Sequence, residues 1–147
     1  MRIAIGADHG GYELKQQIAE FLIAQGYEIN DLGTHSLESV DYPDFAELVA
    51  RAVARDEAER GIVICGTGIG VSMSANKVRG IRAALCTDCY MARMAREHND
   101  AQVLCLGARV LGVGSALEIV QVFLSNEFQG GRHARRVGKI NALDEKE

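Results

Sequence analysis

The residues of this chain that could do chemistry come directly after segments with the composition of buried strands. The segment GIVIC ends at Cys65, and the turn Gly66–Gly70 (GTGIG) leads from it into a helix. Three glycines ahead of a helix form a nest of backbone N–H groups, which can bind an anion or a developing oxyanion. A plain tight turn would need only one glycine, so the pattern indicates a functional site.

Cys65 stands at the mouth of this nest. A thiol beside a helix N-terminus ionises more readily than a free one, so Cys65 could act as a base or nucleophile near neutral pH. A buried core cysteine that merely ends a strand is an equally open alternative. The turn is neither a dinucleotide fingerprint nor a Walker A loop, because Val71 replaces the third glycine and no Gly-Lys-Ser/Thr follows.

Other polar residues also follow predicted elements. Asp8 and His9 come just after the first strand, where a polar pair is expected to be exposed in a crevice, although Asp8 could instead cap the next helix. His98 and Asn99 end a helix, and His98 could simply interact with the helix dipole. Arg109 follows the fifth strand. We take these residues as candidates for binding and proton transfer.

The tail of the chain is basic, although the net charge is -4. Arg132 and Arg136 are four residues apart, as are Arg135 and Lys139, so each pair shares a helical face. Two arginines on one face can bind a phosphate by bidentate hydrogen bonds, whereas the simpler interpretation is a solvated basic face. Apolar positions in the tail are few, which is typical of a helix that docks on another subunit.

Composition excludes several classes of protein. The 147 residues suit a single domain, and 48% hydrophobic content excludes a disordered chain. The acidic balance, 5% aromatic content and absence of Trp argue against nucleic-acid binding. No apolar run is long enough to span a membrane, and the start MRIAIGADHGG does not read as a signal peptide, so we expect a cytoplasmic protein.

The cysteines are expected to be free thiols in a reducing compartment; they are Cys65, Cys86, Cys89 and Cys105. A zinc site normally needs a second ligand pair beside a CxxC. His98 is the nearest candidate ligand, but Cys105 would have to leave an apolar strand pattern to join it. We therefore expect no metal.

Strands and helices are predicted to alternate along the chain. The predicted strands are 2–6, 27–30, 61–65, 81–86 and 102–106. Between and after them, helices are expected before Gly26, from Pro43, through Ala75, over 88–98, behind a capping box at Ser115–Glu118, and over 131–143. This order predicts a parallel sheet covered on both faces, with the ligand beyond the carboxyl ends of the strands.

Together these motifs resemble the ribose-5-phosphate isomerase B family over nearly the whole chain. The segments that carry the resemblance are GADHGGYELK, DYPDFA, ICGTGIGVS with ANK, REHND, LGARV and GGRHARRV. The resemblance implies an α/β fold: a Rossmann-like three-layer αβα sandwich of residues 1–147 with a five-stranded parallel sheet and a C-terminal helix docking on the partner subunit. It also implies cofactor-independent interconversion of D-ribose 5-phosphate and D-ribulose 5-phosphate in a homodimer or homotetramer with shared active sites.

The same resemblance implies roles for individual residues. Cys65 would move the proton between C2 and C1, assisted by Thr67. His98 would help to open the furanose ring, with Asp8 nearby. Backbone N–H groups would stabilise the enediolate; they belong to Gly66, Gly68, Ile69 and Gly70. Other residues would bind the substrate; these are Asn99 and Tyr42 at the sugar, and His9, Arg109, Arg132 and Arg136 at the phosphate.

Three other functions remain open from the sequence. The sugar could be allose 6-phosphate or galactose 6-phosphate, because pocket size is not readable from one chain. A non-catalytic sugar-phosphate sensor would use the nest and the arginines but would need no positioned thiol. A thiol redox protein would use Cys86 and Cys89, and this hypothesis predicts a depressed thiol pKa.

Overall fold

A five-stranded parallel sheet forms the centre of the molecule, for which a computed structural model describes residues 1–146. The strand order is β2-β1-β3-β5-β4, and every neighbouring pair is parallel. The strands are β1 (Arg2–Ala7), β2 (Glu28–Asp31), β3 (Arg60–Cys65), β4 (Ala83–Leu85) and β5 (Val103–Gly107). All five predicted strands are therefore present, although β4 is shorter than the predicted 81–86.

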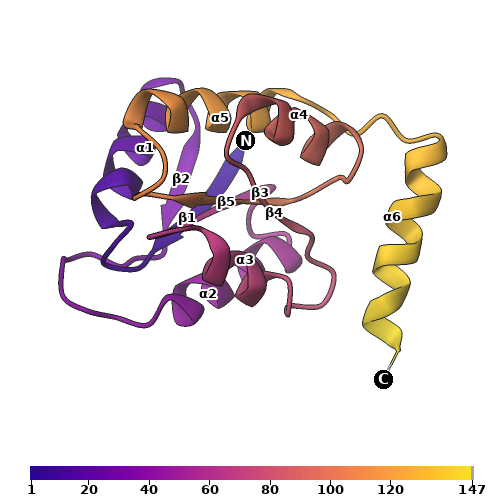
Figure 1. The fold of residues 1–147 in the computed structure, drawn as a ribbon, viewed down its shortest axis with the longest axis horizontal. Helices are drawn as coiled ribbons and strands as arrows, with labels where there is room; N and C mark the ends of the chain where they lie inside the picture. The colour runs from indigo at the N-terminus through magenta and orange to yellow at the C-terminus, as the bar shows by residue number, and fades with distance from the viewer. Residues whose placement is uncertain (147) are drawn as a thin grey trace.

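Helices cover both faces of the sheet, which confirms the predicted three layers (Figure 1). One face carries α1 (Tyr12–Ala24), α4 (Cys89–Glu97) and α5 (Val113–Ser125). The opposite face carries α2 (Tyr42–Ala54) and α3 (Ile69–Ala75). Because each strand leads into a helix that returns across a face, the carboxyl ends of the strands meet at one edge.

The alternation of side chains along the central strand divides the core in two. Ile62 and Ile64 of β3 belong to the cluster under α1, α4 and α5, while Val63 and Cys65 belong to the cluster under α2 and α3. All four side chains are buried, as expected for a strand in the middle of a covered parallel sheet. The position of Cys65 is thus fixed by the strand that it ends.

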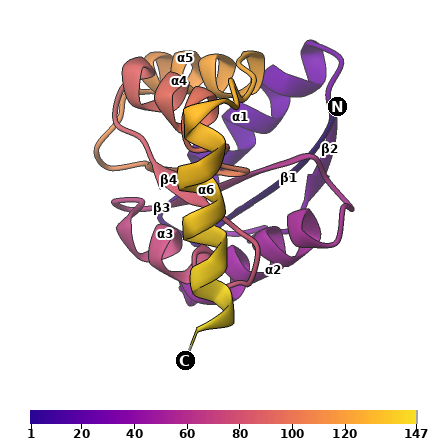
Figure 2. The ribbon, with the colours of Figure 1, turned by 90° about the vertical axis from the view of Figure 1, so that its right-hand side faces the viewer.

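The C-terminal helix α6 (Arg132–Ala142) stands beside these layers rather than within them (Figures 1 and 2). Figure 2 shows it running from the level of α4 and α5 past the sheet toward α3. It continues into the short 3-10 turn η1 (Leu143–Glu145). Val137 is the one buried side chain of α6, whereas Ile140 and Leu143 are exposed, so the predicted helix forms but packs weakly on its own chain.

Two local predictions differ from the structure. The capping box at Ser115–Glu118 is wrong: α5 begins at Val113, because the carbonyl of Gly112 already accepts a hydrogen bond from Ala116 N–H at 3.0 Å. Ser115 therefore lies inside the first turn and caps nothing. Helix α2 begins at Tyr42, one residue before the predicted Pro43, and the proline sits in its first turn, where its missing N–H costs no hydrogen bond.

Candidate active site

A pocket opens at the carboxyl edge of the sheet, where the loops after β1, β3 and β5 meet. Its volume is about 420 Å³. Its lining comes from the end of β3, from these loops, from the first residue of α2 and from α3. The lining residues are Asp8, Tyr42, Cys65, Gly66, Thr67, Ile69, Gly70, Met73 and Arg109. Most of the residues predicted from the sequence therefore lie together in this pocket.

The thiol of Cys65 takes part in the glycine turn. Its Sγ atom accepts a hydrogen bond from the backbone N–H of Gly68 at 3.2 Å, and its side chain is 5% exposed. Gly68 has a φ of 82°, and a Cβ atom built on it would lie 2.5 Å from Leu85 Cδ1, so only glycine fits there. The N–H of Gly68 therefore points at the sulfur and fixes the Cys65 side chain against the turn.

Thr67 lies at the top of the same turn. Its Oγ1 accepts the N–H of Ile69 at 3.2 Å. The hydroxyl proton of Thr67 is consequently free to bond to a ligand in the pocket that Thr67 and Cys65 both line. Thiol and hydroxyl together give one group that can take a proton from carbon and one that can donate to an oxygen.

Arg109 brings a positive charge to the pocket. Its backbone N–H donates to the carbonyl of Gly66 at 3.0 Å, which ties the loop after β5 to the loop after β3. A Cβ built on Gly66 would lie 3.2 Å from Arg109 Nη1, and one built on Gly10 would lie 3.6 Å from Nη2. The guanidinium therefore lies between the loops after β1 and β3, where it can bind an anion.

Asp8 and His9 are less exposed than the sequence suggested. Asp8 is buried and lines the pocket, and its Oδ1 accepts the N–H of Gly11 at 3.1 Å in the loop before α1. Gly11 is the N-cap residue of α1 and no side chain caps the helix, so the capping alternative for Asp8 is wrong. The Nδ1 atom of His9 accepts the N–H of Val40 at 3.1 Å. This bond leaves Nε2–H of His9 as the donor that is available to a ligand.

The rim of the pocket is apolar. The ring of Tyr42 packs against Gly70 so closely that a Cβ at Gly70 would collide with it. Ile69 and Met73 are 48% and 66% exposed, which is unusual for such side chains. Sequence reasoning missed Met73, although its position one helical turn after Ile69 could have placed it on the same face.

Two further predicted residues, His98 and Asn99, lie at the opposite edge of the sheet. Helix α4 runs back from the carboxyl end of β4, so His98 and Asn99 follow it at the amino ends of the strands. Asn99 O accordingly accepts a hydrogen bond from Arg82, which precedes β4. Strand β3 alone separates the two edges by roughly 17 Å, at about 3.3 Å per residue. Within one chain, His98 therefore does not lie near Asp8.

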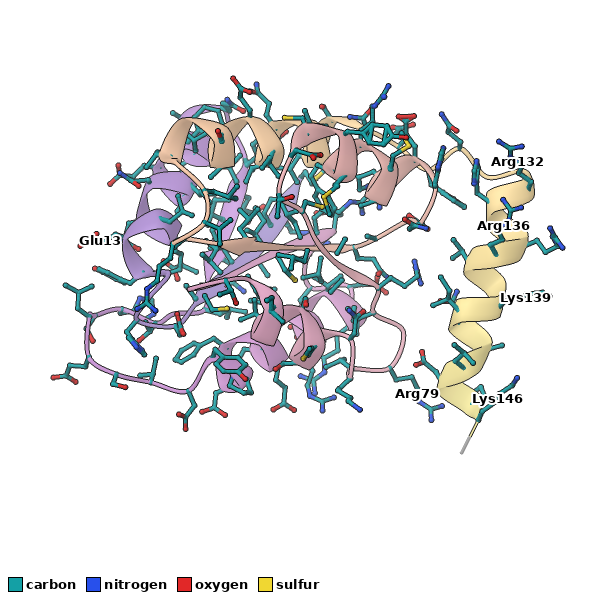
Figure 3. The ribbon with its side chains drawn as sticks, viewed as in Figure 1. Glu13, Arg79, Arg132, Arg136, Lys139 and Lys146 are labelled. Atoms are coloured by element: carbon teal, nitrogen blue, oxygen red, sulfur yellow. The ribbon has the colours of Figure 1, made fainter. Side chains whose placement is uncertain are left out.

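The basic residues of α6 are just as far from the pocket. Figure 3 shows Arg132 and Arg136 on the opposite side of the molecule from Glu13, which follows the Asp8–Gly11 loop in the first turn of α1. The single chain therefore brings Arg109 to the pocket but not the two arginines of the tail.

His133 belongs to this second group, and sequence reasoning assigned it no role. Its ring stacks on that of His98, with the centroids 3.9 Å apart. Desolvation, followed by the neighbouring His98 and arginine charges, lowers the pKa of His133. The stack joins α6 to the end of α4, so the residues of the amino edge form a second cluster.

The thiols outside the pocket do not support redox chemistry or metal binding. Burial raises the pKa of Cys86 to about 12, with a smaller contribution from Asp88, and burial also raises the pKa of Cys105. The redox hypothesis required a depressed pKa at the Cys86–Cys89 pair, which Cys86 contradicts. Within residues 1–146 no group of three or more His, Cys, Asp or Glu side chains is arranged to hold a metal ion.

Comparison with known proteins gives consistent matches over the whole chain. The family model described as Ribose/Galactose Isomerase matches residues 3–140. Ribose-5-phosphate isomerase B of Escherichia coli is 47% identical over 145 residues, which cover 99% of this chain and 97% of the relative. No helix in the described part of the chain is long and apolar enough to cross a membrane.

Solved structures show the same similarity. A ribose-5-phosphate isomerase B from Clostridium thermocellum is 64% identical with a TM-score of 0.99, over 99% of each chain. A Mycoplasma genitalium ribose-5-phosphate isomerase B with bound ribulose-5-phosphate is 43% identical with a TM-score of 0.96, over 99% of this chain and 97% of that one.

Proposed function

This chain belongs to the ribose/galactose isomerase family, and we propose that it interconverts D-ribose 5-phosphate and D-ribulose 5-phosphate as a single-domain enzyme. The observation that carries the proposal is the thiol of Cys65, which accepts the Gly68 N–H at the floor of a pocket that also holds the cationic Arg109. A relative with this fold has been solved with ribulose-5-phosphate bound.

The proposed reaction moves one proton between two carbons. Cys65 as thiolate removes the proton from C2 of the open-chain aldose and returns it to C1 of the enediolate. The N–H groups of the turn 66–70 stabilise the negative oxygen, and the Thr67 hydroxyl exchanges protons with the substrate oxygens. The steps neither oxidise nor reduce the substrate overall, so they need no external oxidant or reductant.

The phosphate is held away from the reacting carbons. Arg109 and Nε2–H of His9 bind it from the pocket side, and Arg132 and Arg136 complete its coordination. Binding energy at the phosphate keeps C1 and C2 against the sulfur of Cys65 during proton transfer. Tyr42 borders the sugar from α2.

We further propose that the second half of the site comes from a second copy of the chain, in a homodimer or in a homotetramer built from such dimers. His98, Asn99, Arg132 and Arg136 lie too far from Cys65 of their own chain to act with it. Each half of the proposed site carries exposed apolar side chains. Ile69 and Met73 lie at the rim of the pocket, and Ile140 lies on α6. A two-fold arrangement buries these faces against each other and places His98 beside the pocket as the acid for ring opening.

The test is a turnover assay with D-ribose 5-phosphate in the presence of a chelator, for wild type and Cys65→Ala. We expect metal-independent formation of ribulose 5-phosphate by wild type, and loss of turnover with retained ligand binding in the variant. Turnover only on allose 6-phosphate or galactose 6-phosphate would reassign the sugar. Binding without turnover, unaffected by Cys65→Ala, would indicate a sensor. Fractionation of the source cells tests the expected cytoplasmic location.

A further inference from the structure

Helix α6 carries two of the proposed phosphate ligands but buries only Val137 on its own chain. Its position must therefore be set by a few specific contacts with the amino edge of the sheet. The contacts at its two ends are polar: Gln129, just before α6, bonds to the backbone and side chain of Glu97, and Asn141, near its end, bonds to Arg82.

Arg82 makes the contact to Asn141 and also binds the turn after α4. It immediately precedes β4, and its side chain is 13% exposed. Its guanidinium donates from Nε to Asn99 O at 3.1 Å, from Nη2 to Asp100 O at 2.8 Å, and from Nη1 to Asn141 Oδ1 at 2.6 Å. One rigid group thus joins the turn after α4 to the far end of α6.

The turn itself has an unusual backbone that needs such support. Asp100 has a φ of 47°, in the left-handed region that few non-glycine residues adopt. Its carboxylate pairs with Arg96 at 3.1 Å and with Arg82 at 3.6 Å, and Arg96 Nη1 also donates to Ala101 O at 2.6 Å. The turn 99–101, directly after His98, is therefore held by two arginines.

We propose that Arg82 is a positioning residue, which holds His98, Asn99 and α6 in the one arrangement that fits the pocket of a second copy of the chain. The inference rests on the proposed function, because it concerns the half of the site that the second copy receives. Arg82 itself does not line the Cys65 pocket. It acts by fixing two elements that are separate in sequence and share little packing.

Arg79 offers a matched control on the same segment of chain. It pairs with Glu145 of η1 at 2.7 Å, but both side chains are about 70% exposed, at 69% and 71%. Figure 3 shows Arg79 near the far end of α6 from Arg132 and Arg136. Arg79→Gln therefore removes an arginine that contacts the tail while it leaves the turn after His98 intact.

The first experiment compares Arg82→Met with Arg79→Gln in steady-state turnover of D-ribose 5-phosphate. We expect Arg82→Met to raise KM by about 10-fold or more, because the phosphate ligands on α6 lose their fixed position, and Arg79→Gln to stay within about 2-fold of wild type. Asn141→Ala removes the tie to α6 but keeps the bonds of Arg82 to the turn after α4, and we expect it to raise KM by about 3-fold or more. This exposed substitution keeps the test valid if Arg82→Met fails to fold.

A spectroscopic measurement tests the position of α6 against the end of α4 directly, whether or not the protein turns over D-ribose 5-phosphate. The stacked rings of His98 and His133 should give nuclear Overhauser effects between them in the ligand-free protein. We expect Arg82→Met and Asn141→Ala to lose these effects and Arg79→Gln to keep them. If both variants keep the effects and the wild-type KM, the positioning role is overturned. Failure of wild type to turn over the sugar would instead overturn the proposed function and leave the ring measurement to decide the role of Arg82.

Mixed assemblies show which pocket depends on Arg82. When Cys65→Ala and Arg82→Met subunits exchange at random, half of the dimers contain one chain of each kind. In such a dimer, one of the two sites pairs the intact Cys65 of the Arg82→Met chain with the intact Arg82 of the Cys65→Ala chain. We expect about a quarter of all sites to regain the wild-type KM, since closed two-fold dimers form statistically. Absence of any recovery would mean that Arg82 serves the pocket of its own chain, which would contradict the proposal.

Discussion

The two edges of the sheet are built by different means. At the carboxyl edge the loops are joined mainly through backbone hydrogen bonds: Ala108 N–H donates to Cys65 O at 2.9 Å, and Asp8 N–H donates to Ile64 O at 3.2 Å. At the amino edge the turn after α4 and the helix α6 are joined largely through side chains, with Arg82 at the centre.

This difference matches the proposed division of the site: the carboxyl edge forms the thiol half within one chain, and the amino edge is proposed to serve the pocket of a second copy. The backbone contacts at the carboxyl edge leave no space between the loops, as Gly68 and Gly107 show, so the thiol and its donors are fixed within the chain. Helix α6 has no comparable support, and its exposed Ile140 remains to be covered. Substitutions at the first edge should therefore damage chemistry or folding, and those at the second should damage binding.

The largest effect is expected at the thiol. Cys65→Ala removes the proposed base, and loss of a general base reduces kcat by roughly 10² to 10⁴-fold. Ligand binding should persist, because Arg109 and the arginines of the tail are unchanged, and calorimetry with ribose 5-phosphate would measure it. Cys89→Ala changes a partly exposed thiol outside the pocket and should leave kcat within about 2-fold. Equal losses in both variants would contradict the assignment of Cys65.

The turn that holds the thiol should be sensitive to a single methyl group. In Gly68→Ala the new Cβ would meet Leu85 and the backbone of Leu106 at a φ of 82°, so we expect a loss of about 2–4 kcal/mol in the free energy of unfolding. Gly114→Ala is the matched control, because it lies in α5 with no atom within 4 Å of the new Cβ. It should be neutral or stabilise by about 0.5–1 kcal/mol in urea unfolding.

The carboxyl edge could be predicted from sequence because local patterns determine it. The apolar run that ends at Cys65 and the glycines after it specify a buried strand and a tight turn, and both are present. The amino edge depends on partners distant in sequence: nothing near Arg82 indicates that it binds Asn141. The capping box at Ser115–Glu118 failed for a related reason, since the same pattern fits a first helical turn that a neighbouring glycine has already begun.

Substitutions of the proposed phosphate ligands in the tail test the amino edge. Arg136→Ala should raise KM for ribose 5-phosphate by about 10–100-fold with little change in kcat or in thermal stability, because the side chain is exposed and its loss removes mainly ground-state binding. Arg135→Ala changes the neighbouring exposed arginine, which faces another direction on the helix, and should leave KM unchanged. An identical rise in both variants would show that the net charge of α6 matters rather than the position of Arg136.

The smallest effect is an alkaline loss of stability that originates at the buried thiol of Cys86, directly after the carboxyl end of β4. Burial raises the pKa of Cys86 to about 12, so the folded state retains the thiol proton while the unfolded state releases it near pH 8.5. The stability that this neutral thiol contributes is complete below pH 8.5 and declines as pH rises toward 12. At one pH unit above the unfolded pKa the loss is at most about 1.4 kcal/mol. Urea unfolding of wild type and Cys86→Ala at pH 7 and pH 9.5 should show a smaller alkaline decrease in the variant. An equal decrease in both would assign the loss to other titrating groups.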